Sequence, residues 1–360
     1  MKHRSRGWLL LLVAVMSLGA AAAGSQRLLD HEFWARADYG AAYFAIVRMG
    51  EDVNQRDDFG VTPLHLAAAN SADPAVIRLL LEHGARVGAV DDRGWTPLHA
   101  GAAFGPNPEV LRVLVEAGAR PNAQNERGWT PLHVAAAYNP NPEAVRVLVD
   151  LGANVQALAW RGWREIALDR LNLNSSQRVY VMARSKLAVG YERGFTPLHA
   201  AAAASENPEV VRELVRLGAK VNAPTLEGFT PMHAAAVYNE HQEVLRTLGL
   251  LGAGLDARNV NGMTPLHFAV GFRFLNPEGA RTLLEMGADP NAQDRDGWTP
   301  LHYAVWEEST PEAALLLLAF GADPGLRTVD GLTAWDLAQR NDRLRAHEDF
   351  ERLRRALRAP

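Results

Sequence analysis

The sequence predicts an all-α repeat solenoid, a stack of helix-turn-helix units joined by β-hairpin loops, with a modified unit capping each end. Three observations predict it: a Thr-Pro-Leu-His tetrapeptide recurs, most neighbouring copies are 34 residues apart, and the same helix signals follow each copy. Copies begin at Thr62, Thr96, Thr130, Thr196, Thr230 (with Met232 for Leu), Thr264 and Thr299, and altered copies begin at Arg164 and Thr333.

The first 24 residues differ from the repeats and have the layout of a signal peptide. Three basic residues precede an apolar run from Trp8 to Leu18, and a stretch of small residues follows it. The run is too short for a comfortable membrane span, so we expect cleavage after about Ala23. A buried N-terminal helix is the alternative, but core helices rarely have this order of charge and hydrophobicity.

Composition narrows the classes of function. With 360 residues, of which 48% are hydrophobic and 22% charged, the chain has ample material for a folded core. Its net charge of −4 offers no overall cationic surface, so we expect no nucleic-acid partner. There is no cysteine, which excludes disulfides, thiolate metal sites and a cysteine nucleophile, and which favours a bacterial periplasm or exterior over a eukaryotic secretory route.

Each unit contains two short helices whose ends can be recognised. Thr as N-cap and Pro at the first helical position start the first helix, and alanines such as Ala135 to Ala137 let neighbouring helices approach closely. A second signal, for example Asn107-Pro108-Glu109, starts a helix with a broad Leu/Val face, and a pair such as Gly118-Ala119 ends it. Asn, Asp and a second glycine then predict a turn or hairpin before the next threonine.

Together, Gly-x-Thr-Pro-Leu-His, Ala-Ala, the Leu/Val-rich second helix and Gly-Ala-x-x-Asn resemble the ankyrin repeat over residues 45–337. The resemblance implies an ankyrin stack that binds a partner protein on a concave surface of hairpins and first helices. The usual ankyrin period is about 33 residues, and we expect the extra residue in the turn between the two helices. Such a resemblance implies a scaffold and leaves the target open.

We expect six segments along the chain. They are a signal peptide (1–24), an N-terminal cap and half repeat (25–58), ankyrin repeats (59–154), a degenerate repeat (155–191), further ankyrin repeats (192–337) and a C-terminal capping helix (338–360). The cap is expected to lack a regular first helix, because Phe44 to Asn54 resembles only the second half of a repeat. The degenerate repeat is either drift in a unit held by its neighbours, or a hinge or lateral binding site where two arrays meet.

The sequence carries no recognisable catalytic or metal-binding motif. The seven tetrapeptide histidines recur once per unit, at His65, His99, His133, His199, His233, His267 and His302. Packed helices lie about 8–10 Å apart whereas zinc needs ligands at about 2.0 Å, so we predict structural histidines, no metal and no other cofactor. Phosphate-binding loops, nucleophile elbows and His-Glu-x-x-His are absent from the sequence, and we predict that the protein is not an enzyme.

Two columns of hairpin residues are candidates for partner binding. The residue after the hairpin glycine is Val61, Trp95, Trp129, Trp163, Phe195, Phe229, Met263, Trp298 and Leu332 in successive units. The residue before the glycine is Arg93, Arg127, Arg161 and Arg193 in four successive units, then Glu227, Asn261, Asp296 and Asp330. Tryptophan and arginine are the residues most enriched at binding hot spots. Packing against the next hairpin is the competing role for the aromatic column.

A third column lies five residues after each histidine and includes four aromatic residues, Phe104, Tyr138, Tyr238 and Phe272. In the ankyrin family this end of the first helix commonly faces the partner. Our sharpest prediction is a single patch formed by Arg93, Trp95, Phe104, Arg127, Trp129 and Tyr138. The wider set of predicted partner-binding residues adds Arg161, Trp163, Arg193, Phe195, Tyr238 and Phe272.

The sequence therefore predicts an exported, non-enzymatic scaffold for protein–protein interaction, in the periplasm or secreted. One alternative is a secreted effector that acts on a host protein. Another is a receptor for a small molecule or glycan, because aromatic rings also stack on flat ligands. We expect a monomer that binds another protein, with no stable membrane insertion after signal cleavage.

Overall fold

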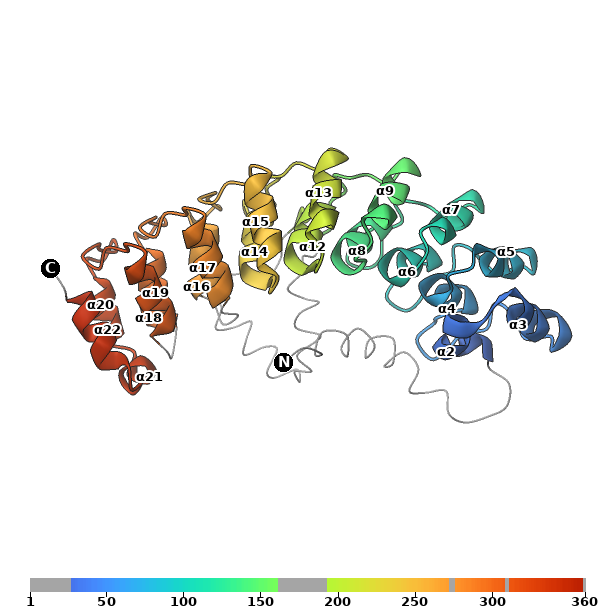
Figure 1. Ribbon diagram of the computed structural model, residues 1–360, viewed down its shortest axis with the longest axis horizontal. Coiled ribbons are helices and arrows are strands. Elements are labelled where there is room, and N and C mark those ends of the chain that lie inside the picture. The colour runs from blue at the N-terminus through green and yellow to red at the C-terminus, as the bar shows by residue number, and fades with distance from the viewer. Residues whose placement is uncertain (1–26, 161–192, 272–275, 308–310, 359–360) are drawn as a thin grey trace. The chain divides into compact units, whose positions relative to one another are not determined.

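The computed structural model describes residues 27–160, 193–271, 276–307 and 311–358, which form two compact units divided between Ala159 and Trp160. Within each unit the first helices of the repeats form one layer and the second helices form another (Figure 1). The predicted all-α repeat solenoid is confirmed. The described residues contain isolated β-bridges and no β-strand, so the predicted β-hairpins are turns. We keep the name hairpin for the turn that precedes each first helix. Within these ranges, no helix is both long and apolar enough to cross a bilayer.

Unit 1 contains four pairs of helices, preceded by the single turn η1 (Arg27–Leu29). Its first-layer helices are α2 (His31–Arg36), α4 (Pro63–Asn70), α6 (Pro97–Phe104) and α8 (Pro131–Tyr138). Its second-layer helices are α3 (Tyr39–Tyr43) with its continuation η2 (Phe44–Arg48), α5 (Pro74–Glu82), α7 (Glu109–Glu116) and α9 (Pro142–Asp150). Each helix packs against the equivalent helix of the next repeat, so the two layers run the length of the unit.

Unit 2 continues the same pattern. Its first-layer helices are α12 (Pro197–Ala204), α14 (Pro231–Tyr238), α16 (Pro265–Gly271), α18 (Pro300–Glu307) and α20 (Ala334–Ala338). Its second-layer helices are α13 (Pro208–Arg216), α15 (Gln242–Leu250), α17 (Pro277–Glu285) and α19 (Glu312–Ala319), followed by α21 (Asp342–Arg345) and α22 (Phe350–Leu357). Helix α22 packs on α19 and α20, with Leu353 and Leu357 buried, and so covers the last repeat.

The N-terminal cap has a first helix, and our expectation that it lacks one was wrong. Helix α2 packs against α4, and its fully buried Trp34 donates from Nε1 to the Leu28 carbonyl at 2.8 Å. The helix starts at Asp30, which accepts a hydrogen bond from the Glu32 backbone at 2.9 Å. An Asp cap stands here in place of Thr-Pro, which is why the repeat pattern did not indicate the helix.

The degenerate repeat predicted over 155–191 spans the division between the two units. Most of it lies outside the described residues, so drift and hinge both stay predictions for this segment.

On either side of it, the regular repeats pack closely because the first helices are rich in alanine. Ala135, Ala136, Ala201 and Ala202, for example, are fully buried.

Six of the tetrapeptide histidines each join two neighbouring repeats. The Thr62 backbone N–H donates to Nδ1 of His65 at 3.2 Å, so Nδ1 is an acceptor and Nε2 carries the ring proton. Nε2 then donates to the Trp95 carbonyl of the next hairpin at 3.0 Å. The same pair of contacts recurs at His99, His199, His233, His267 and His302.

Asparagines near the turn between the two helices of a repeat also join neighbouring repeats. Asn139 donates from Nδ2 to the Ala102 carbonyl at 3.0 Å, which is one of the otherwise unpaired carbonyls near the end of the preceding first helix. Asn239, Asn276 and Asn341 make the equivalent bonds to Ala202, Ala236 and Val305. The turn between the two helices is therefore anchored to the repeat before it.

The buried histidines are held in the neutral form. Desolvation lowers the pKa to about 4 at His65, His99, His199 and His267, and to about 3 at His233, because burial disfavours the imidazolium ion. Hydrogen bonds from Nε2 to backbone carbonyls oppose this shift only in part.

We predict that acid destabilises the fold before most carboxylates titrate. An unfolded histidine has a pKa near 6.5, so below that pH the unfolded chain binds protons that the folded chain does not. The stabilisation that each neutral histidine contributes is then fully present above about pH 6.5. As the pH drops toward 4, the free energy of unfolding falls by up to about 1.4 kcal/mol per pH unit for each such histidine. Urea unfolding at several pH values measures this slope. A free energy that stays constant between about pH 6.5 and 5 would contradict it.

Candidate functional site

The hairpins hold their flanking side chains in fixed positions. Asp91 Oδ1 accepts hydrogen bonds from the backbone of Arg93 at 2.9 Å and of Trp95 at 2.7 Å, while Gly94 between them has a positive φ of 75°. Burial raises the pKa of the Asp91 carboxyl, and these backbone bonds partly offset the rise. Asn125 closes the next hairpin in the same way, through Arg127 and Trp129 at 2.9 Å each.

Successive hairpins are also bonded to each other. The Glu126 backbone N–H donates to the Arg93 carbonyl at 3.2 Å, and the equivalent bond joins Asp92 to Phe59 at 3.0 Å. Unit 2 repeats this link, for example from Leu226 to the Arg193 carbonyl at 2.9 Å. Because these described hairpins are bonded to their neighbours, their side chains at equivalent positions form columns with a fixed spacing within each unit.

Three of the six predicted patch residues form a continuous row of rings in unit 1. Trp95 stacks on Phe104 with ring centroids 6.2 Å apart and an interplanar angle of 10°, and Phe104 lies 6.0 Å from Tyr138. All three side chains are half-buried. We call Trp95, Phe104 and Tyr138 the aromatic row. It crosses from a hairpin to the ends of two first helices, α6 and α8, as the predicted patch requires.

Of the two arginines predicted in the patch, Arg93 is exposed and Arg127 is half-buried. Both stand directly before a hairpin glycine. Arg93 therefore adds an accessible positive charge two residues from Trp95.

Trp129 and Phe195 do not offer rings to a partner, and this part of the predicted surface needs correction. Trp129 is 1% exposed with its ring 5.7 Å from that of His133, and Phe195 is 0% exposed with its ring 4.9 Å from that of His199. Val61, Phe229 and Met263 in the same column are buried as well. A residue here directly precedes the buried threonine of the helix start, so most members of the column pack inside the stack.

The remaining predicted residues are distributed as follows. Arg193 is exposed on the first described hairpin of unit 2, and Tyr238 is half-buried at the end of α14. Arg161, Trp163 and Phe272 lie outside the described residues.

Unit 2 has a second aromatic cluster that the sequence analysis did not single out. The Trp298 ring lies 5.0 Å from Tyr303 and 6.2 Å from Trp306, and the Tyr303 hydroxyl donates to Asp294 at 2.7 Å. Trp306 is exposed. The columns included Trp298 but missed the cluster, because Trp306 follows His302 by four positions rather than five. Three aromatic residues within nine positions were a visible signal.

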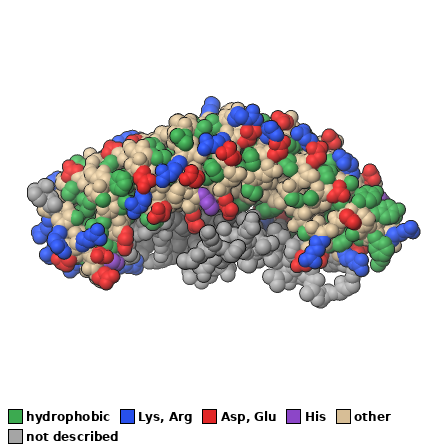
Figure 2. Space-filling model, in the orientation of Figure 1, with side chains coloured by type: hydrophobic (Ala, Val, Ile, Leu, Met, Phe, Trp, Pro, Cys, Tyr) green, Lys and Arg blue, Asp and Glu red, His purple; other side chains and the backbone are tan. Residues whose placement is uncertain are grey.

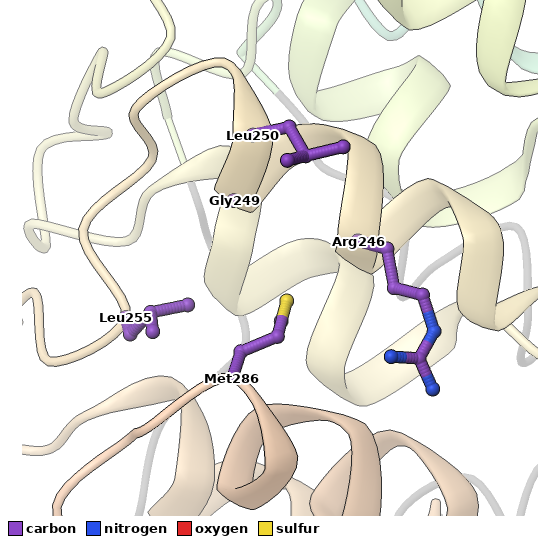
Figure 3. Close-up of a pocket in the computed structure, with 5 residues that line it drawn as sticks. All are labelled: Arg246, Gly249, Leu250, Leu255 and Met286. Carbon is purple, nitrogen blue, oxygen red and sulfur yellow. The ribbon is translucent and has the colours of Figure 1, made fainter.

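Unit 2 also has a shallow apolar hollow of about 370 Å³ between α15 and α17 (Figure 3). It is lined by Arg246, Gly249, Leu250, Leu255 and Met286. Gly249 provides the space, since the equivalent position holds Val215 in the preceding repeat and Leu284 in the next. Arg246 donates to Glu285 at 2.9 Å. The hollow belongs to the second-helix layer, away from the hairpins.

The histidines are engaged in structure rather than chemistry. Both ring nitrogens of His65 are within hydrogen-bond distance of groups in the stack, as described above. Across the described ranges, no three His, Asp or Glu side chains gather as a metal site would require.

Comparison with known families agrees with this geometry. The family model described as Ankyrin repeats (3 copies) matches residues 33–125, 172–252 and 248–328. The chain belongs to the ankyrin-repeat family. A second model, Ankyrin repeats (many copies), matches residues 102–149, which include the Phe104 and Tyr138 part of the aromatic row. None of the curated proteins compared with it matches the chain. Ankyrin repeats are scaffolds for protein–protein interaction, so this ankyrin stack is a scaffold of that kind.

Trp95 and Trp129 occupy equivalent positions, so substituting each of them tests which one packs inside the stack and which one lies at the surface. We predict that Trp129→Ala lowers the free energy of unfolding by about 3–5 kcal/mol, because it empties a buried site. Trp95→Ala should cost less than about half of that, because its ring is only half-buried. Chemical denaturation of the two variants measures both values. Equal losses would contradict the division of the column into packing and surface residues.

Proposed function

We propose that the protein is an exported, non-enzymatic scaffold that holds a partner protein on the aromatic row and the Arg93 hairpin. The observation that carries the proposal is the arrangement of Trp95, Phe104 and Tyr138 in one half-buried row across two repeats. Rigid aromatic side chains supply large contact areas at little cost in conformational entropy, and together with arginine they dominate binding hot spots.

The surroundings of the row suggest the chemistry of the partner. Arg93 is exposed beside Trp95, so a partner segment with apolar side chains next to a carboxylate would match this surface. Within unit 2 the charge at this hairpin position changes sign, because Arg193 is exposed on the first described hairpin and Asp296 and Asp330 are exposed on later ones. Charge complementarity would therefore fix the direction of a partner segment bound along unit 2.

We predict that Trp95→Ala combined with Tyr138→Ala weakens partner binding by at least about tenfold, because each ring is expected to contribute more than about 1 kcal/mol. The test compares proteins captured by tagged wild type with those captured by the variant. Trp306→Ala in unit 2 is the control, since it removes an exposed tryptophan that lies outside the aromatic row.

A protein retained by the wild type and the control but lost from the double variant would support the proposal. Equal capture by all three would contradict it, provided that circular dichroism shows the same helix content for each. Capture of a glycan with no protein would favour the receptor alternative, and recovery of the protein from culture medium would favour a secreted effector.

Export is supported by the leader-like first 24 residues and by the absence of cysteine. We predict that the full chain with a C-terminal tag, expressed in a bacterium, is recovered from the periplasm or medium with an N-terminus near Ala23. Cell fractionation followed by N-terminal sequencing tests this prediction. Recovery from the cytosol with Met1 to Ala23 intact would contradict export and leave the fold unaffected.

A further inference from the structure

The second helix of the N-terminal cap leaves large apolar side chains in solvent. Five residues of α3, η2 and the turn after them are 38–50% exposed, namely Tyr39, Tyr43, Phe44, Val47 and Met49. We call them the cap face. The other side of the same segment is buried, and α3 packs on α5. The outer side of a terminal repeat is expected to be polar, so an apolar group there marks a surface that meets something else.

Acidic side chains outnumber basic ones around the cap face. Residues 27–52 contain five carboxylates and three arginines. Asp38 and Asp52, which flank the cap face in sequence, are both exposed. Of the three arginines, Arg36 is already paired with Glu32 at 3.7 Å. The charges around the cap face therefore favour a cationic occupant over an anionic one.

The C-terminal cap has the opposite charge. Residues 340–358, which include α21 and α22, contain seven arginines, all of them exposed, and four carboxylates. Helix α22 buries Leu353 and Leu357 and packs on α19 and α20, whereas Arg352 and Arg355 are exposed. These two arginines are three positions apart, so they are neighbours on the helix surface, and we call them the α22 arginines. Figure 2 shows hydrophobic side chains gathered at the α3 end of unit 1 and basic side chains at the α22 end of unit 2.

The α22 arginines are available to a partner. Among the described residues of this cap, ion pairs join Arg345 to Asp342 at 3.3 Å and Arg354 to Glu351 at 3.0 Å, and none includes the α22 arginines. Arginine stacks on tyrosine and phenylalanine rings and also pairs with carboxylates. The α22 arginines therefore match a face of exposed rings that is bordered by carboxylates.

We propose that the cap face of one copy of the chain docks on the α22 arginines of a second copy, so that the N-terminal end of one molecule meets the C-terminal end of the next. The contact joins two different surfaces, so each pair of copies keeps one unused surface of each kind and can add further copies. It uses none of the residues assigned to partner binding, and it is independent of whether the aromatic row binds a protein.

The contact is small, because α22 has only eight residues. Small interfaces are typical of weak association, so we expect assembly only at high protein concentration. The monomer expected from the sequence is the competing prediction, and the same measurements decide between the two.

Sedimentation velocity on the full chain tests the association. We expect the average mass to rise with protein concentration, and to return to that of the monomer as salt is raised from about 0.05 M to about 0.5 M, because salt screens the attraction between arginines and carboxylates. A monomer at every concentration would overturn the proposal. Association that salt leaves unchanged or strengthens would also overturn it, since the contact would then be purely apolar.

Two double variants locate the contact. Arg352→Glu with Arg355→Glu reverses the charge of the α22 arginines, and Phe44→Lys with Val47→Lys makes the cap face polar and basic. Each double variant should raise the Kd of self-association by at least about tenfold, because each removes one of the two complementary surfaces. Unchanged association in either folded variant would contradict the proposal.

The control makes the same charge change elsewhere. Arg120 directly after α7 and Arg281 in α17 are both exposed, and Arg120→Glu with Arg281→Glu alters the net charge as much as the α22 variant does. We expect wild-type association from this control. An equal loss of association in the control would show an effect of net charge alone and would overturn the proposal.

Mixing the α22 variant with the cap-face variant tests the orientation of the contact. Neither should associate alone, but the intact cap face of one can meet the intact α22 arginines of the other. We expect dimers in the mixture and nothing larger. A cap face that bound a second cap face would instead leave the α22 variant associating on its own, against the proposal. If circular dichroism shows that the cap-face variant folds poorly, the α22 variant, its control and the salt dependence still decide.

Discussion

The hydrogen bond from a buried histidine to the next hairpin, which six of the repeats make, is the interaction on which the rest of the stack depends. His65 accepts a bond from the start of its own helix and donates to the backbone of Trp95, so one side chain fixes both a helix start and the spacing to the following repeat. The two bonds together require a neutral imidazole with its proton on Nε2, because Nδ1 must accept while Nε2 donates. Burial, which lowers the pKa of these rings, therefore maintains the state that the pair of bonds requires.

The same bond positions the candidate binding surface. The carbonyl that accepts the hydrogen bond from His65 belongs to Trp95, whose side chain is the first ring of the aromatic row. From there the row depends on helix packing, because alanine-rich first helices approach closely enough for Phe104 of α6 to meet Tyr138 of α8 at 6.0 Å. A surface built in this way is rigid before it meets a partner, which reduces the entropy lost on binding.

Much of this could be predicted from the sequence, because the repeat signals are local. Each helix begins at a Thr-Pro or similar signal and ends at a glycine, and these signals depend only on neighbouring residues. The fold follows from the recurrence of these signals and of the histidine. The structure brings Phe104 and Tyr138, at the ends of the first helices, together with Trp95, while their role in partner binding stays a prediction.

The errors arose where tertiary packing decides the outcome. Trp95 and Trp129 occupy equivalent positions with the same flanking Arg, Gly and Thr, yet one is half-buried and the other fully buried. No local pattern distinguishes them, because burial depends on atoms from adjacent repeats. The short helix α2 was missed for a related reason, since its Asp30 cap lies outside the repeat signature and its stability comes from packing on α4.

The most direct measurement of partner contact is photocrosslinking in the cell, with a photoreactive amino acid placed at Phe104 in one strain and at Leu250 in another. Binding through the aromatic row predicts a single covalent adduct with a partner protein from position 104 and none from position 250, which lies on the second-helix layer. An adduct from position 250 with none from position 104 would contradict it and would place the partner on the opposite layer of the stack.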